Sequence, residues 1–132
     1  MIGLDANVIV RYLVRDDKRQ AAKASAYILN AASINESLFI NNIVLCELVW
    51  VLESCDQFSK EQIVGALEAI LITKQFEFEN KDAVRQAVSD YSNGKADFAD
   101  YLIGRSNLDS SCDCTVTFDR SLKNADGFEL LK

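Results

Sequence analysis

The chain has 132 residues, of which 49% are hydrophobic, and a formal net charge of −6. This length predicts one compact domain over residues 1–132, and the apolar content argues against an intrinsically disordered protein. The acidic balance argues against a general nucleic-acid coating protein, which would be basic, but it suits a site of clustered acids or a basic protein partner.

The first half of the chain alternates short apolar runs with stretches of helical periodicity. Residues 1–4 and 37–40 predict strands, because each is a short apolar run. Apolar side chains recur at helical spacing in residues 6–14, 18–31 and 43–52, which predicts three helices.

The same alternation continues to the end of the chain. Ser59 and Gln62 have the spacing of a capping box, which predicts a helix from this point to Ile72. Asn93-Gly94 is a signal for the carboxyl end of a helix. The other predicted elements are strands over 76–79, 115–118 and 128–131 and helices over 82–92 and 96–107.

Strands that alternate with helices are typical of an α/β fold. The pattern predicts a mostly parallel sheet with helices on both faces. In such sheets ligands bind beyond the carboxyl ends of the strands. Residues that directly follow a strand are therefore the first candidates for a functional site.

The cysteines bear on the compartment and on metal binding. The chain shows no secretory signal and no apolar run long enough to span a membrane, so a cytoplasmic protein with reduced thiols and no membrane contact is expected. No His is present, and Cys112-Asp113-Cys114 lacks the usual zinc spacing. Packing or loop roles are therefore expected for the cysteines.

Two aspartates directly follow predicted strands. Asp5 follows the first strand and Asp119 follows the fourth. If both strands are central and parallel, the two carboxylates emerge at the same edge of the sheet. The alternative for each is a helix cap or a turn residue, which are common positions for Asp after a strand.

A single acid interrupts an apolar helix. Glu47 lies within residues 44–50, where nearly every neighbour is apolar. A charged residue in such a stretch is seldom buried without a partner or a metal, which favours a role in a site. The alternative is that Glu47 faces solvent on a narrow polar side. Trp50 in the same helix is expected in the core, with a dimer interface as the alternative.

A second pair of aspartates opens the predicted helix over 96–107. Asp97 is expected to cap this helix through a hydrogen bond to the backbone, with a supporting role in the site as a further possibility. Asp100 lies in the first turn, where the helix dipole favours the ionised carboxylate. Asp100 is expected to belong to the site rather than to be a second start signal.

Carboxylates gathered in this way need a cation. At about 5 Å and an effective dielectric constant near 20, each pair of charges repels by roughly 3 kcal/mol. Mg²⁺ takes oxygen ligands and polarises phosphoryl groups and water. The lack of His argues against a serine or cysteine hydrolase, and the lack of a glycine-rich loop argues against nucleotide-binding folds.

Four segments of the chain resemble the four acidic motifs of PIN domains, and are most similar to those of VapC-type toxins. They are residues 5–13, 46–52, 97–103 and 117–119. The similarity extends over essentially the whole chain. Each motif alone is weak, whereas four in this order and at this length are fairly specific.

The resemblance implies a three-layer α/β/α sandwich and cleavage of RNA, often tRNA, with Mg²⁺ or Mn²⁺. It also implies a homodimer and inhibition by a cognate antitoxin protein, expected to be basic. In this resemblance Asp5 and Asp100 match the main metal ligands and Glu47 and Asp119 complete the catalytic quartet. The matching supporting positions are Asn7 and Thr117.

Several basic side chains are candidates for RNA contact. Arg11 and Arg15 are four residues apart and are expected to share a helical face. Arg105, Arg120 and Lys123 are the other candidates. The alternative for each is solvated surface charge.

Two other functions remain open. One is a catalytically silent module that keeps the fold and binds RNA or protein. The other is an aspartyl phosphotransfer or phosphatase domain, because an Asp after the first strand can be a nucleophile. Such domains commonly have a second Asp two residues on, where this chain has Asn7.

Overall fold

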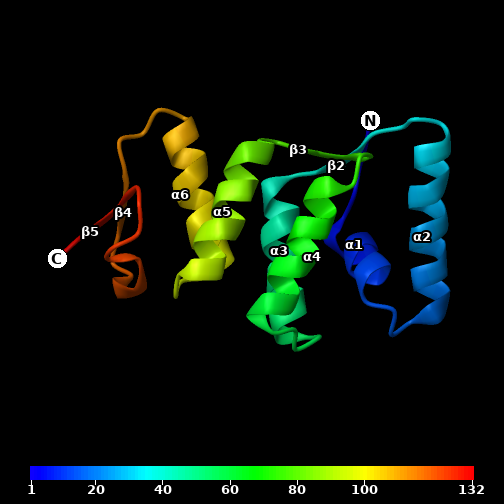
Figure 1. The fold of residues 1–132 in the computed structure, drawn as a ribbon, viewed down its shortest axis with the longest axis horizontal. Coiled ribbons are helices and arrows are strands. Elements are labelled where there is room, and N and C mark those ends of the chain that lie inside the picture. Colours follow the sequence, from blue (N-terminus) through cyan, green and yellow to red (C-terminus); the bar gives the residue numbers. More distant parts are fainter. The chain divides into compact units, whose positions relative to one another are not determined.

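The structure is a computed structural model that describes all 132 residues and comprises two compact units. Unit 1 is Met1–Glu79 and unit 2 is Asn80–Lys132. Figure 1 colours unit 1 from blue to green and unit 2 from green to red. No helix has both the length and the apolar character needed to cross a membrane.

Unit 1 is built on a parallel sheet in the order β1-β2-β3. Its strands are β1 (Ile2–Gly3), β2 (Leu38–Ile40) and β3 (Phe76–Phe78). Its helices are α1 (Ala6–Leu13), α2 (Lys18–Ser33), α3 (Asn42–Ser54) and α4 (Lys60–Ile72). Each parallel pair is joined through helices, as parallel strands require.

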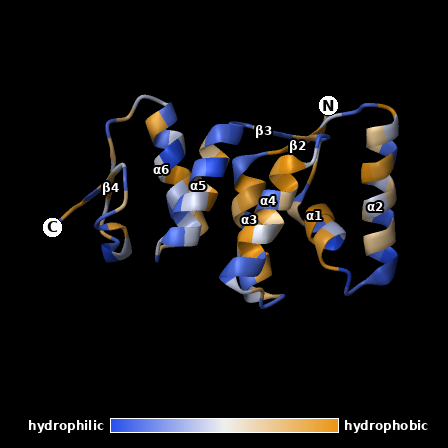
Figure 2. Ribbon diagram, in the orientation of Figure 1, coloured by the Kyte–Doolittle hydropathy of each residue, from blue (hydrophilic) through white to orange (hydrophobic).

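The core of unit 1 is aliphatic. Leu38 and Ile40 of β2 are fully buried, because alternate residues of a strand share one face. Figure 2 shows that α3 is mostly hydrophobic, and three of its leucines are fully buried. These are Leu45, Leu48 and Leu52, at the spacing of one helical face. The buried stripe fixes how α3 lies in unit 1, and with it the position of Glu47.

Unit 2 pairs two helices with a two-stranded parallel sheet. The helices are α5 (Lys81–Asn93) and α6 (Phe98–Asp109), and the sheet is formed by β4 (Thr115–Thr117) and β5 (Phe128–Leu130). A single turn of 3₁₀ helix, η1 (Arg120–Leu122), lies between the strands. Phe98 is fully buried and contacts Tyr91 edge to face, with ring centroids 5.9 Å apart.

The predicted α/β class and the parallel pairing of strands are confirmed. The capping box at the start of α4 is also confirmed, since both hydrogen bonds between Ser59 and Gln62 are present. Gly94 ends α5 as predicted, but its φ of −110° is not the left-handed conformation of a glycine cap. Helix α6 begins two residues later than predicted, at Phe98.

Candidate functional site

Asp5 follows β1 and caps helix α1. Its Oδ1 atom accepts a hydrogen bond of 2.9 Å from the backbone N–H of Ala6, and its side chain is exposed. Asp5 lines a hollow of about 550 Å³ together with Asn7 and Arg11. The cap holds one carboxylate oxygen and leaves the other available for a ligand, so capping and a role in the site are compatible.

Glu47 lies on the exposed face of α3. Its neighbours on this face, Ile43 and Trp50, have 72% and 64% of their surface exposed. The prediction that Trp50 lies in the core is therefore wrong for unit 1, because Leu45, Leu48 and Leu52 occupy the buried stripe instead. Glu47 faces outward within unit 1, on a face that is otherwise apolar.

Further polar side chains at the carboxyl edge of the unit 1 sheet were not found by sequence reasoning. Asn41 follows β2, and its side chain accepts a 2.8 Å hydrogen bond from Val44 N–H as the cap of α3. Glu79 follows β3, and its Oε1 atom accepts a 2.8 Å hydrogen bond from Asn42 N–H. An Asn before a helix and an acid directly after a strand were the signals that could have found them.

Asp100 is the candidate whose surroundings are least favourable to a negative charge. It lies in the first turn of α6 and is partly buried, and desolvation raises its pKa above the ordinary value of 3.8. A hydrogen bond to the backbone of Asp97 opposes the rise, whereas the charges of Asp97 and Asp119 add to it. Asp97 occupies the cap position of α6 but makes no capping hydrogen bond, so that part of the prediction is wrong.

Asp119 is held by a network that lowers its pKa. Its Oδ1 atom accepts hydrogen bonds from the Ser121 hydroxyl at 2.6 Å and the Ser121 backbone N–H at 2.9 Å. These bonds stabilise the charged carboxylate and lower its pKa, the hydroxyl being the larger cause. The Thr117 hydroxyl accepts a 3.0 Å hydrogen bond from Asp119 N–H. Ser121 was not predicted, although a Ser two residues after an Asp is a recognisable turn signal.

The acidic candidates are divided between the two units. Unit 1 carries Asp5 and Glu47, and unit 2 carries Asp100 and Asp119, which repel each other electrostatically. Within neither unit are three Asp, Glu or Cys side chains grouped closely enough to hold a metal ion. Each unit therefore supplies only part of the predicted set of ligands.

The basic candidates differ in how far their charges are already paired. Arg105 binds Asp90 through two hydrogen bonds of 2.7 and 2.9 Å, and this pairing raises the pKa of Arg105. Arg11 pairs with Asp16 at 2.9 Å. Arg15 lies beyond the end of α1, so the prediction that it shares a helical face with Arg11 is wrong.

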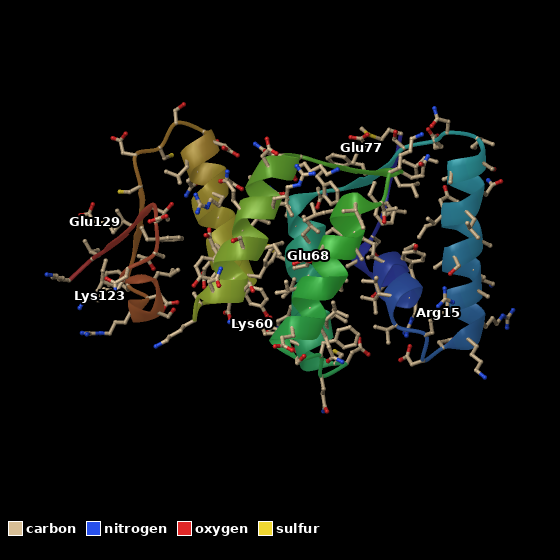
Figure 3. All side chains as sticks on the ribbon, viewed as in Figure 1. Arg15, Lys60, Glu68, Glu77, Lys123 and Glu129 are labelled. Atoms are coloured by element: carbon tan, nitrogen blue, oxygen red, sulfur yellow. The ribbon has the colours of Figure 1, made fainter.

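The last two basic candidates lie in and just after η1. Arg120 is in η1, and Lys123 directly follows it and is labelled in Figure 3. Both are exposed and neither forms an ion pair.

Comparison with known proteins identifies the family. The PIN domain family matches residues 2–127, so the chain belongs to this family. The chain is also similar to a VapC ribonuclease of Aquifex aeolicus, with 28% identity over 99 residues, covering 75% of this chain and 73% of that protein. The family match includes all four acidic candidates, from Asp5 to Asp119.

Proposed function

We propose that this chain is an endoribonuclease that depends on Mg²⁺ or Mn²⁺ and uses Asp5, Glu47, Asp100 and Asp119 together. Membership of the PIN domain family and the similarity to a VapC ribonuclease support a nuclease. The observation that carries the metal dependence is that Asp100, whose pKa is raised mainly by burial, also lies in the field of the negative charges of Asp97 and Asp119, which conflict with its own. A hard divalent cation would remove this conflict, and an all-oxygen set of ligands suits it.

The proposed division of labour follows from the chemistry of the side chains. A bound divalent cation would supply a Lewis acid and a water of lowered pKa. Asp5 and Asp100 are proposed as the main ligands, with Glu47 and Asp119 completing the set. Asp119 is kept ionised by Ser121, which suits a ligand more than a proton donor. A carboxylate that is not occupied by the metal can orient the attacking water and accept its proton.

The proposed setting is a toxin–antitoxin pair. RNA, including tRNA, is the proposed substrate, and a basic antitoxin that enters the acidic site is the proposed inhibitor. A homodimer in the cytoplasm is the proposed state of the protein. The net charge of −6 supports the choice of a basic partner.

The test compares RNA cleavage by the wild type and by Asp5→Asn, with Mg²⁺ and with excess EDTA. Cleavage is expected only for the wild type with metal. Asp113→Asn is the matched control, because Asp113 is also an exposed aspartate but lies outside the proposed quartet. Cleavage in EDTA, or equal activity of Asp5→Asn, contradicts the proposal. Binding of RNA without cleavage would indicate the catalytically silent module instead.

A further inference from the structure

Unit 2 contains a second hollow that the acidic candidates do not line. It has a volume of about 480 Å³ and lies between the end of α5, the side of α6 and the segment that begins at η1. Buried Tyr101 forms part of its wall and accepts a 3.2 Å hydrogen bond from Ala96 N–H through its hydroxyl. This bond ties the loop between α5 and α6, which carries Lys95, to helix α6.

The charges around this hollow are unequally compensated. Lys95, Arg120 and Lys123 line it, all three are exposed, and none forms an ion pair. The two carboxylates in its lining belong to Asp90 and Asp126. Arg105 binds both oxygens of Asp90 and also interacts with Asp126. Arg105 therefore offsets one of these two negative charges, so the charges of Lys95, Arg120 and Lys123 are in excess around the hollow and can face an anion.

The hollow is directly connected to Asp119. Ser121 lines the hollow, and its hydroxyl donates the 2.6 Å hydrogen bond to Asp119 Oδ1. Arg120 lies between Asp119 and Ser121 in the chain. An anion held in the hollow therefore lies beside Ser121, which is hydrogen-bonded to a carboxylate of the proposed catalytic quartet.

We infer that Lys95, Arg120 and Lys123 form a subsite for the backbone of single-stranded RNA, in which a phosphate next to the scissile one binds. This inference rests on the proposed function, and it adds Lys95 and a defined hollow to it. Lysine and arginine side chains that are not in ion pairs can bind the closely spaced phosphates of an RNA strand. Such contacts hold the strand without reading its bases. In an acidic protein, this local excess of positive charge gives the strand a preferred approach.

The test measures binding separately from cleavage. A short fluorescein-labelled single-stranded RNA is titrated with the full chain in EDTA, and its anisotropy is followed. The Lys95→Ala/Lys123→Ala double variant is compared with Lys74→Ala/Lys132→Ala, which removes two exposed lysines outside the hollow. Each lost phosphate contact lowers the slope of log affinity against log salt by about 0.7, which is about fivefold in affinity at about 0.1 M salt.

The double variant is therefore expected to bind about 25-fold more weakly, with the slope reduced by about 1.4, while the control binds as the wild type does. With Mg²⁺ present, its KM is expected to rise while kcat is retained. Equal affinity of the two double variants overturns the subsite. Full competition by inorganic phosphate at concentrations comparable to those of the RNA also overturns it, because it shows a site for a free anion.

The proposed function can fail independently of the subsite. If the wild type binds this RNA through the hollow but cleaves nothing with any divalent metal, the nuclease proposal fails and the subsite stands. If Asp5→Asn abolishes cleavage while the lysine variants change neither KM nor affinity, the nuclease proposal stands and the subsite fails.

Discussion

The hydrogen bond from the Ser121 hydroxyl to Asp119 can be removed by a single mutation that leaves the other contacts of this carboxylate in place. Ser121→Ala removes the 2.6 Å hydrogen bond to Asp119 Oδ1 and leaves the 2.9 Å bond from the Ser121 backbone N–H. The bond from Asp119 N–H to Thr117 also remains. The carboxylate keeps its place but loses the donor that most lowers its pKa.

Groups that orient a metal ligand are typically worth 10- to 100-fold in metal affinity or activity, and because one of the two bonds to Oδ1 remains, we expect about tenfold. The assay is the rate of RNA cleavage as Mg²⁺ is titrated. The concentration for half-maximal rate should rise about tenfold in Ser121→Ala, whereas the rate at saturating Mg²⁺ should change little.

The pH dependence gives a second readout of the same change. Because the hydroxyl lowers the pKa of Asp119, its removal lets that pKa rise toward the ordinary range. The loss of activity on acidification should therefore begin at a higher pH in Ser121→Ala. Ser121→Thr keeps the hydroxyl and is the control. Unchanged Mg²⁺ dependence in Ser121→Ala, or equal impairment of Ser121→Thr, would refute the reasoning.

Three other predictions follow from unit 2. Because the pKa of Asp100 is raised above 3.8, the stabilisation from its protonated form is lost as the pH rises. Asp100→Asn should therefore have a higher Tm than the metal-free wild type at neutral pH, but not below pH 3.8. A Tm difference that does not change with pH contradicts this. Arg105→Met should cost about 1–2 kcal/mol in urea unfolding, since the pair with Asp90 is partly buried, and should weaken RNA binding, because Asp90 then faces the hollow without its cation; a cost near zero contradicts it. Thr117→Val should raise the Mg²⁺ concentration for half-maximal cleavage, as Ser121→Ala does, because Asp119 N–H loses its acceptor; a wild-type response contradicts it.

The elements of the fold were predictable because their signals are local. The capping box of Ser59 and Gln62 marks the start of α4 within the sequence itself. Short apolar runs, and the alternation of apolar and charged residues in 76–79, marked all five strands to within two residues at each end. Periodicity fixes such elements because burial of one face requires it.

The surroundings of the site residues were less predictable because they depend on geometry between segments. Asp97 has the right type and position for a cap, yet it makes no capping hydrogen bond. Trp50 is exposed because three leucines of α3 occupy its buried stripe. The sequence alone could not show whether Trp50 or the three leucines are buried, since all four are apolar side chains in the same helix. The pairing of Arg105 with Asp90 likewise depends on how α5 packs against α6.

The most direct test of the central claim is Mn²⁺ binding measured by electron paramagnetic resonance, with four variants compared with the wild type. They are Asp5→Asn, Glu47→Gln, Asp100→Asn and Asp119→Asn. If carboxylates from both units share one cation, each substitution should weaken binding, with Asp5→Asn and Asp100→Asn affecting it most. Glu68→Gln, an exposed acid outside the quartet, should bind as the wild type does. Tight binding that survives Asp5→Asn but not Asp100→Asn would contradict the shared site.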